Sequence, residues 1–524
     1  MPEETTLDVA VIGGGVSGVY SAWRLKTAQP QLRVAVFEGS DRVGGRLLSA
    51  RPPGIPNLRA ELGGMRYLTS QPIVTALIQD VFKIQQYDFP VSESNNIAYL
   101  RGEWLRDVDL TDPAQLPYRL SWQEEGKSAG DVVIDAIDQI LPGATSMTDA
   151  QRRVAVRTAS FAGRPLWQQG FWQVLYRVMS SEAYAFAKDA GGYDTTLANW
   201  NAADAIPWYL SDFGTDAKYY GLTDGYETLP WDIAEAFTAA GGTLELGAWL
   251  AGFDVNADGV RLRFESGEVV NAKRVILAMP RRAIELVAAG APFLQQKKVA
   301  GLLGAVTGQP MFKLWTAYRY PWWSAAGVSQ GKSNTDLPIR QCYYWGTVNE
   351  AGGPAANTNS LLQASYDDGT NAGFWDGLRP RRGRNRAAKG HHEWFEGELC
   401  DAEQSEAGDR ALRNWTSRPA PAAMVAELQR QLATLHDLDF VPRPYTAAFM
   451  DWGDDPYGGA WNSWNIGVRS WKVYDRVQRP DPNSPVYVCG EAYSNAQGWV
   501  EGALDTAESM LTSHFGLDTP DWLQ

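Results

Sequence analysis

The 524-residue sequence has few of the residues that build disulfide frameworks or metal sites. It contains three cysteines and four histidines. Three thiols form no framework of the kind that staples small secreted proteins, and they fall short of a four-thiolate metal site. No histidines are arranged as H-E-x-x-H, which excludes the zinc hydrolases that use this motif. We therefore expect no metal.

Positive charge and long apolar runs are also scarce. The chain carries 47 basic against 61 acidic residues. A nucleic-acid binder needs clustered positive charge to neutralise phosphates, so this class is excluded. No stretch approaches the about 18 apolar residues of a membrane span, and the acidic residues 3–4 are unlike the start of a signal peptide. These absences predict a cytoplasmic protein with no nucleic-acid or membrane partner.

What is present is enough sequence for about three domains, with a regular order of elements. Residues 7–37 are predicted to form a strand, a glycine-rich turn, a helix and a second strand. Helical spacing dominates residues 121–209, and strands return at residues 260–279. A helix is expected at residues 424–435, and a strand at 486–489 precedes a terminal helix.

A dinucleotide site is indicated where the first strand meets the first helix. Residues 13–18 (GGGVSG) fit G-x-G-x-x-G. In this pattern Gly13 permits the tight turn, Gly15 lets a pyrophosphate approach the backbone, and Gly18 lets the helix pack on the strand. Glu38 lies 20 residues after Gly18, at the end of the second strand, where its carboxylate can accept hydrogen bonds from ribose hydroxyls.

Two further glycine pairs indicate which dinucleotide, FAD or NAD, is bound. Residues 44–45 and 63–64 are both Gly-Gly, and Arg46 follows the first pair. Repeated pairs indicate backbone packed closely along an extended cofactor, with Arg46 able to reach its phosphates. A plain NAD domain needs none of this, so FAD is the better fit.

Three other segments attract attention for different reasons. Residues 126–130 (GKSAG) match the G-x-S-x-G of serine hydrolases, but a polar segment precedes them instead of the buried strand that this motif requires. Residues 331–333 (GKS) lack the first glycine of a phosphate loop. Residues 379–389 are rich in arginine and precede an acidic stretch; a solvated insertion, a lid and an oligomer contact are all open interpretations.

Several segments in chain order resemble the flavin amine oxidases, and within them the L-amino acid oxidases. They are residues 38–46, 63–66 (GGMR), 224–230 (DGYETLP), 331–338 (GKSNTDLP), 490–491 and 498–503 (GWVEGA). The resemblance implies an α/β (α+β) fold in three parts. These are a Rossmann-like FAD-binding domain of residues 1–68, 223–307 and 440–524, a sheet-based substrate domain of residues 69–118 and 308–439, and an inserted helical domain of residues 119–222.

The same resemblance implies a set of cofactor contacts. They are Gly13, Gly15, Gly18, Glu38, Arg46, Gly64, Met65, Arg66, Leu250, Gly490, Glu491, Trp499 and Val500. Ala460 stands where monoamine oxidases carry the cysteine that links their flavin. We therefore expect FAD to be bound non-covalently.

Substrate-binding residues are implied in the same way. Arg66 resembles the guanidinium that clamps the α-carboxylate of an amino acid, with Tyr366 as its second contact. Trp461 and Trp499 resemble an aromatic pair whose facing rings form a narrow slot, and the Gly498 carbonyl accepts from the substrate amine. Lys313, set among apolar residues, is expected to be buried and to assist catalysis with a lowered pKa.

The expected reaction is oxidative deamination of an L-α-amino acid by O2 to a 2-oxo acid, ammonia and hydrogen peroxide, in a homodimer. The many tryptophans, and the lack of an acid assigned to the pocket, favour large apolar or aromatic side chains. Residues 200–222, rich in Trp, Tyr and Asp, leave basic substrates open. The alternatives are an amino-acid 2-monooxygenase that forms an amide, an amine or polyamine oxidase, and a flavoprotein without catalysis.

Overall fold

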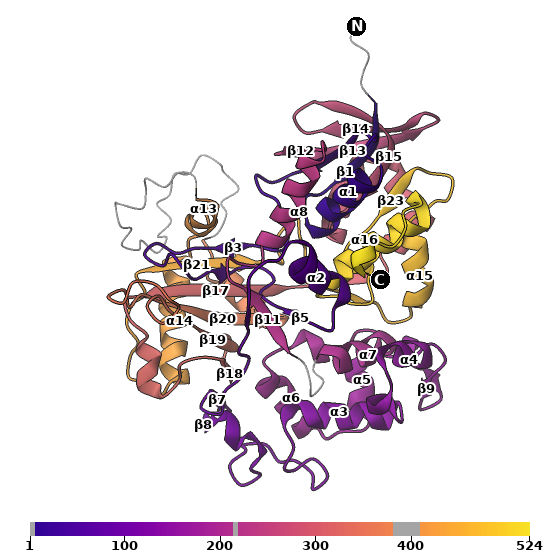
Figure 1. Cartoon of the computed structure of the whole chain (residues 1–524). Helices are drawn as coiled ribbons and strands as arrows, with labels where there is room; N and C mark the ends of the chain where they lie inside the picture. The colour runs from indigo at the N-terminus through magenta and orange to yellow at the C-terminus, as the bar shows by residue number, and fades with distance from the viewer. Residues whose placement is uncertain (1–5, 213–217, 381–408, 524) are drawn as a thin grey trace.

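The computed structural model describes residues 6–212, 218–380 and 409–523. Figure 1 shows three parts: a sheet flanked by helices that holds both ends of the chain, a second sheet beside it, and a helical unit below. This arrangement confirms the α/β class expected from the sequence. Among the described residues, no helix has both the length and the apolar character needed to cross a bilayer.

The first sheet has seven strands, and its parallel part resembles a Rossmann sheet. In spatial order this part is β12 (Thr243–Leu246), β2 (Val34–Glu38), β1 (Leu7–Ile12), β15 (Val269–Leu277) and β23 (Val486–Val488). The antiparallel strands β13 (Leu250–Asn256) and β14 (Gly259–Phe264) extend it from the first half of β15. Residues 9–12 of β1 are buried, alternately on the two faces of the sheet, which explains why all four are apolar.

Helices cover both faces of this sheet. On one face lie α1 (Val16–Ala28), α8 (Thr228–Ala239) and α16 (Val500–Phe515). On the other lie α9 (Arg281–Val287), α10 (Pro292–Gln295) and α11 (Lys297–Leu303), with α15 (Ser470–Val477) beside them. The first and last segments of the chain therefore share a core with the middle segment.

The second sheet also has seven strands. Its order is β21 (Thr446–Asp451), β17 (Met311–Tyr318), β20 (Ser360–Asp368), β19 (Gln341–Thr347), β18 (Lys332–Thr335), β7 (Ile97–Leu100) and β8 (Glu103–Arg106). Helices α12 (Thr370–Asp376), α13 (Arg410–Thr416) and α14 (Ala422–Leu435) pack beside it. The position of β21 differs from the predicted boundary at residue 440, because its pairing with β17 places it in this sheet.

Two small sheets join the parts. In one, β11 (Tyr219–Leu222) pairs with β5 (Tyr67–Leu68) and β6 (Gln86–Asp88). In the other, β16 (Val306–Gln309) pairs with β22 (Trp461–Trp464). Strand β11 falls inside the predicted helical domain of residues 119–222, yet its hydrogen bonds go to segments outside it. Both joints adjoin residues predicted to bind substrate.

The helical unit contains α3 (Ala129–Ile140), α4 (Asp149–Ala155), α5 (Phe171–Leu175), α6 (Ser181–Gly191) and α7 (Ala202–Asp212). Their apolar faces share one core, into which Trp461 of β22 also packs. Ser128 caps α3: its hydroxyl accepts from the Asp131 N–H at 3.2 Å. The serine of the G-x-S-x-G match is therefore a helix cap, which explains why no buried strand precedes it.

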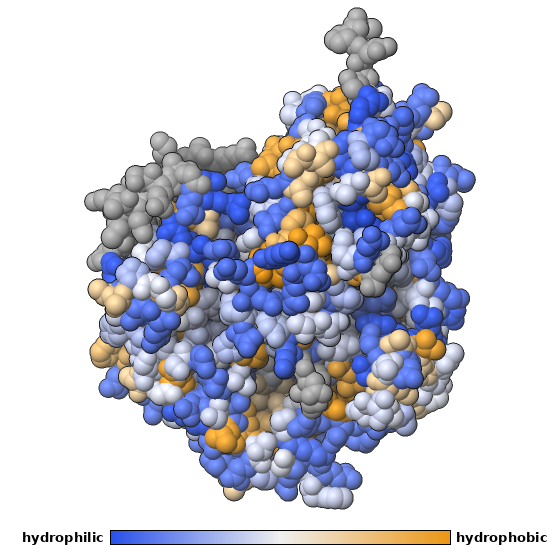
Figure 2. Space-filling model, in the orientation of Figure 1, coloured by the Kyte–Doolittle hydropathy of each residue, from blue (hydrophilic) through white to orange (hydrophobic). Residues whose placement is uncertain are grey.

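Two remaining features concern the outside of the molecule. Arg379, the first residue of the arginine-rich segment, forms ion pairs with Asp451 at 2.6 Å and Asp454 at 2.8 Å. Residues 381–408, which hold the rest of that segment, lie outside the described residues. The face in Figure 2 is mainly hydrophilic, with apolar residues gathered in small groups.

Candidate active site

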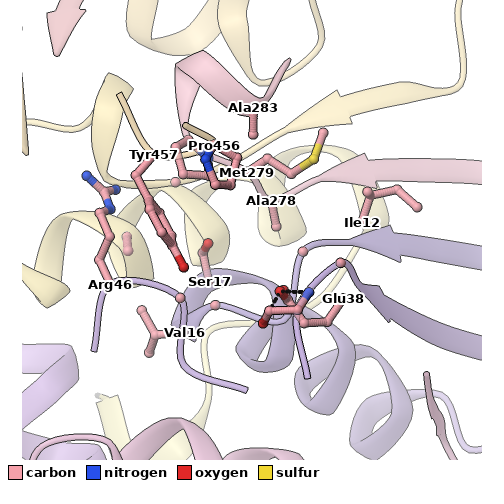
Figure 3. Close-up of a pocket in the computed structure, with 18 of the residues that line it drawn as sticks. Ile12, Val16, Ser17, Glu38, Arg46, Ala278, Met279, Ala283, Pro456 and Tyr457 are labelled. Atoms are coloured by element: carbon pink, nitrogen blue, oxygen red, sulfur yellow. Dashed lines mark hydrogen bonds between the residues drawn. The ribbon is translucent and has the colours of Figure 1, made fainter. Parts of the chain in front are cut away.

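A cavity of about 700 Å³ lies against the glycine-rich turn that follows β1. We call it the dinucleotide cavity. Ten of the predicted cofactor contacts line it: Gly13, Gly15, Glu38, Arg46, Gly64, Leu250, Gly490, Glu491, Trp499 and Val500. Figure 3 shows Glu38 on one side of this cavity and Arg46 with Tyr457 on the other. Of the other predicted contacts, Gly18 lies beneath the turn, and Met65 and Arg66 line a second cavity.

The three motif glycines each meet a different demand. Gly13 has φ +111°, and a Cβ there would lie 2.4 Å from the Ala278 carbonyl oxygen. A Cβ on Gly18 would lie 1.9 Å from the Gly13 carbonyl oxygen. Gly15 is the N-cap of α1, makes no side-chain cap bond, and faces the cavity. The first N–H groups of α1 therefore stay open to an anion, as a pyrophosphate requires.

Replacing Gly18 with alanine is expected to push α1 away from the turn. Such a clash costs about 1–3 kcal/mol of folding free energy, and it displaces the N–H groups that face the cavity. We expect a lower melting temperature and a lower flavin content, measured by the ratio of visible to ultraviolet absorbance. The matched control is Gly191→Ala in α6, where a Cβ meets nothing within 4 Å. Equal flavin content in both variants would contradict this assignment.

Glu38 occupies the place expected of a ribose ligand. Its Oε2 accepts from the Gly14 N–H at 2.6 Å, and its Oε1 accepts from the backbone N–H and hydroxyl of Ser40 at 2.8 and 2.7 Å. These contacts fix the carboxylate at the end of β2, facing the cavity (Figure 3). The Gly44-Gly45 pair supports the same turn, because the Gly44 N–H donates to the Gly14 carbonyl at 2.9 Å and Gly45 packs on Gly15.

Arg46, the predicted phosphate contact, lines the dinucleotide cavity and is paired with an acid. Its guanidinium forms an ion pair with Glu491 at 2.8 Å and donates to the Ala460 carbonyl at 2.8 Å. Arg46 lines both cavities, so it lies at their junction. In this structure its charge is balanced by Glu491.

The second cavity, about 150 Å³ in volume, adjoins the first. We call it the inner cavity. The two share Arg46, Gly64, Ala460, Gly498, Trp499 and Val500. All the residues predicted for substrate binding and catalysis line the inner cavity: Arg66, Lys313, Tyr366, Trp461, Gly498 and Trp499. The structure thus brings together residues from five separate segments of the chain, directly beside the dinucleotide cavity.

Arg66 is a partly buried cation on the wall of the inner cavity. Among the residues that the structure describes, no carboxylate lies within ion-pair distance of it. Its guanidinium lies over the Tyr219 ring at 4.4 Å and the Phe89 ring at 5.5 Å, and it donates to the Tyr343 hydroxyl at 3.1 Å. A guanidinium that is partly removed from water is stabilised when an anion pairs with it. The inner cavity therefore suits a ligand that brings a carboxylate.

Lys313 is 2% exposed, so it is not a surface lysine. Its amine donates to the Glu61 carbonyl at 3.0 Å and the Gly63 carbonyl at 2.6 Å. Burial lowers the pKa of Lys313 to about 7. A neutral amine has two N–H groups, so both carbonyls can be satisfied while its lone pair stays free to accept a proton. Lys313 is thus built to exchange a proton near neutral pH.

The two predicted tryptophans line the inner cavity, but each stacks on a different ring. Trp461 stacks on Trp208, with centroids 5.5 Å apart and planes 10° apart, and Trp499 stacks on Tyr219 at 6.4 Å and 16°. Glu491 fixes their backbone, since its Oε1 accepts from the N–H groups of Asn462 and Gly498. The Gly498 position, with φ +86°, is held by this carboxylate.

Sequence analysis missed the acid in the inner cavity. Asp212 is 6% exposed and lines this cavity, and its Oδ2 accepts from the Trp499 indole N–H. Burial raises the pKa of Asp212 to about 7. The sequence alone assigned no acid to the pocket, and the structure places Asp212 there. Asp212 is the last residue of α7, within the Asp-rich segment already noted, and only the fold shows that it points inward.

Comparison with known proteins places this geometry in a family. The family model described as flavin containing amine oxidoreductase matches residues 16–509. Aplysianin-A of Aplysia kurodai is 26% identical to this chain over 98% of its length and 91% of the relative's. Achacin of Lissachatina fulica is 25% identical, over 97% of this chain and 93% of the relative's. An L-amino-acid oxidase of Mus musculus is 25% identical over 68% of this chain and 53% of its own.

Solved structures show the same fold. A putrescine oxidase bound to putrescine covers 98% of this chain with a TM-score of 0.67 and 18% identity. The flavin of the family agrees with the dinucleotide cavity and with the cofactor expected from the sequence, which is FAD. Since the family model spans most of the 524 residues, the chain belongs to the flavin-containing amine oxidoreductases.

Proposed function

We propose that this protein is an L-amino acid oxidase, which converts L-α-amino acids and O2 to 2-oxo acids, ammonia and hydrogen peroxide. The observation that carries the proposal is Arg66, a cation on the wall of the inner cavity that has no acidic partner among the described residues. A guanidinium binds a carboxylate with two parallel hydrogen bonds, and a simple amine offers it nothing. The relatives named as L-amino-acid oxidases support the same substrate class.

Each residue of the inner cavity has a role that follows from its chemistry. Arg66 and Tyr366 hold the carboxylate, while the Gly498 carbonyl accepts from the substrate amine between Trp461 and Trp499. The neutral amine of Lys313 accepts a proton that the substrate loses. When bound non-covalently in the dinucleotide cavity, FAD would supply the two-electron redox chemistry that links substrate oxidation to O2. The aromatic walls exclude water and fix the orientation of the substrate.

Product analysis separates this proposal from the monooxygenase alternative. With L-leucine, we expect mass spectrometry to find 4-methyl-2-oxopentanoate and free ammonia. An amide that keeps the nitrogen and has lost carbon dioxide would favour the 2-monooxygenase instead. Hydrogen peroxide as product, a homodimer and a cytoplasmic location stay predictions from the sequence.

Two classes of substrate side chain suit the inner cavity, one apolar or aromatic and one cationic. The rings of Tyr193, Trp208 and Trp461 on the cavity wall suit the large apolar or aromatic side chains that were expected. Asp212 favours a second candidate, a substrate with a cationic side chain, because an ionised carboxylate in a cavity attracts a cation.

Replacing Asp212 with asparagine tests the second candidate. We expect the ratio of kcat/KM for L-lysine to that for L-phenylalanine to fall about 10- to 150-fold, since a charge-assisted hydrogen bond contributes about 1.5–3 kcal/mol. In the unmodified enzyme this ratio should rise as the pH passes 7, because Asp212 ionises there. Asp204→Asn is the matched control: this buried acid of α7 bonds Ser470 and does not line the inner cavity. An unchanged ratio in Asp212→Asn would leave the apolar preference.

A further inference from the structure

A buried tyrosine next to the inner cavity binds Arg66. Tyr343 of β19 is 1% exposed and is absent from the lining of that cavity. Its hydroxyl accepts from Arg66 at 3.1 Å and donates to the Gln341 Oε1 at 3.4 Å. Tyr343 is thus in contact with the proposed carboxylate clamp without being placed to touch the substrate.

A second cation lies beside the same phenol. Lys332 is opposite Tyr343 in the pairing of β18 with β19, and its amine donates to the Gln341 Oε1 at 3.2 Å. This amine is 5.9 Å from the centre of the Tyr343 ring and 5.6 Å from that of Tyr193. Among the described residues, neither Arg66 nor Lys332 has a carboxylate within ion-pair distance. Two positive charges therefore flank one phenol.

Most of the groups around Tyr343 are aromatic. Tyr193 follows α6, Tyr366 lies on β20, Tyr219 lies on β11, and the Phe89 ring packs against Tyr343 at 6.1 Å. Lys313 lies near Arg66 and adds a positive charge when protonated. Two acids lie near the two cations, Asp107 near Lys332 and Asp212 near Arg66, and each adds a negative charge when ionised. Burial opposes ionisation, yet the charges of Lys332 and Arg66 prevail and lower the pKa of the Tyr343 phenol.

We propose that Tyr343 is a positioning residue that balances the charge of Arg66 while the inner cavity is empty and takes up one proton from solvent when a substrate carboxylate binds to Arg66. The proposal rests on the proposed function, since it assumes that Arg66 is the carboxylate clamp. When the carboxylate arrives, it supplies the negative charge that the two cations need. This negative charge raises the pKa of the Tyr343 phenol. An O–H bond therefore forms on Tyr343, and the complex holds one more proton than the free enzyme and ligand.

The test uses the flavin-loaded enzyme and 3-phenylpropanoate, a carboxylate that lacks the reacting amine. Proton uptake on binding is measured by calorimetry in buffers of different ionisation enthalpy, from pH 6 to 10, with the dissociation constant taken from the same titrations. In the unmodified enzyme we expect uptake to rise towards one proton per ligand as the Tyr343 phenol ionises. Over that range the dissociation constant should increase about tenfold per pH unit.

Three variants test whether the proton is taken up by Tyr343. Tyr343→Phe should remove the uptake that belongs to the phenol and leave the contributions of Lys313 and Asp212, whose pKa values are both about 7. Lys332→Gln keeps Tyr343 but removes one cation, so the uptake should move to higher pH. Tyr344→Phe is the matched control, because this neighbouring buried phenol bonds Ser333 and His436 instead of Arg66, and its uptake should equal that of the unmodified enzyme.

The outcomes distinguish this inference from the proposed function. If Arg66→Met binds 3-phenylpropanoate as tightly as the unmodified enzyme, or if the unmodified enzyme does not bind it, the carboxylate clamp is wrong. If binding needs Arg66 but Tyr343→Phe takes up as many protons as the unmodified enzyme, only the role of Tyr343 is overturned. An uptake profile that does not move in Lys332→Gln would also contradict it.

Discussion

Replacing Arg66 with methionine is expected to lower kcat/KM for L-amino acids by about 30- to 4,000-fold. Removing one partner of a buried, hydrogen-bonded charge pair costs about 2–5 kcal/mol, and about 1.4 kcal/mol corresponds to a factor of ten. Because Arg66 has no acidic partner among the described residues, the methionine variant leaves no protein carboxylate unpaired. The loss should therefore report the substrate contact and not a damaged fold.

Steady-state peroxide release over a range of L-amino acid concentrations measures this effect. Arg66→Lys should recover only part of the rate, because an ammonium cannot form the two parallel hydrogen bonds of a guanidinium. Arg430→Met, which removes a largely exposed arginine paired with Glu427 on α14, should behave as the unmodified enzyme. If Arg66→Met keeps full activity towards L-amino acids, the substrate is not held by its carboxylate.

Replacing Lys313 with methionine is expected to lower kcat/KM by about 10²- to 10⁴-fold, the usual contribution of a positioned acid or base. With the pKa of Lys313 at about 7, its neutral form is lost as the pH falls below 7. The activity of the unmodified enzyme should therefore fall with decreasing pH through this value. The methionine variant should be slower at every pH and should lack this fall. Initial rates of O2 consumption from pH 5.5 to 9 measure both effects.

The stability of the same variant separates catalysis from folding. The folded protein holds the pKa of Lys313 below its ordinary value of 10.5, so between about pH 7 and 10.5 the unfolded chain binds a proton that the folded chain does not. The free energy of unfolding contributed by Lys313 therefore rises with pH in this window. Lys313→Met should lose this rise and be at least as stable at pH 7. A variant that unfolds more easily, or that keeps the rate and its pH dependence, would contradict a catalytic role.

The part of the fold set by local pattern was predictable. Gly13, Gly15 and Gly18 lie between an apolar strand and a helix; a Cβ on Gly13 or Gly18 would clash with the backbone, and Gly15 faces the dinucleotide cavity. The helical spacing of residues 121–209 likewise identified a unit whose helices share one core. By contrast, the places of β11 and β21 depend on pairing with strands far away in the chain, and spacing along the sequence carries no information about such partners.

The residues of the candidate site were also only partly predictable from the sequence. Arg66 and Trp499 stand in segments that resemble a known family, and Lys313 was noted as a lysine set among apolar residues; the structure places all three around one cavity. Asp212 and Tyr343 stand in no such segment. Their importance comes from what surrounds them: a carboxylate at the end of α7 bonded to Trp499, and a phenol between two cations. Such juxtapositions arise only when distant segments fold together.

The most direct test of the account compares L-amino acids with their decarboxylated amines. Purified, flavin-loaded enzyme is given all twenty L-amino acids, selected D-enantiomers and the amines that lack the carboxylate, such as phenylethylamine and cadaverine, and hydrogen peroxide release is measured. The account predicts peroxide with L-amino acids and none above background with the amines, because only the former supply the carboxylate that Arg66 lacks. Turnover of the amines at rates equal to those of the matching amino acids would contradict it and make the protein an amine oxidase.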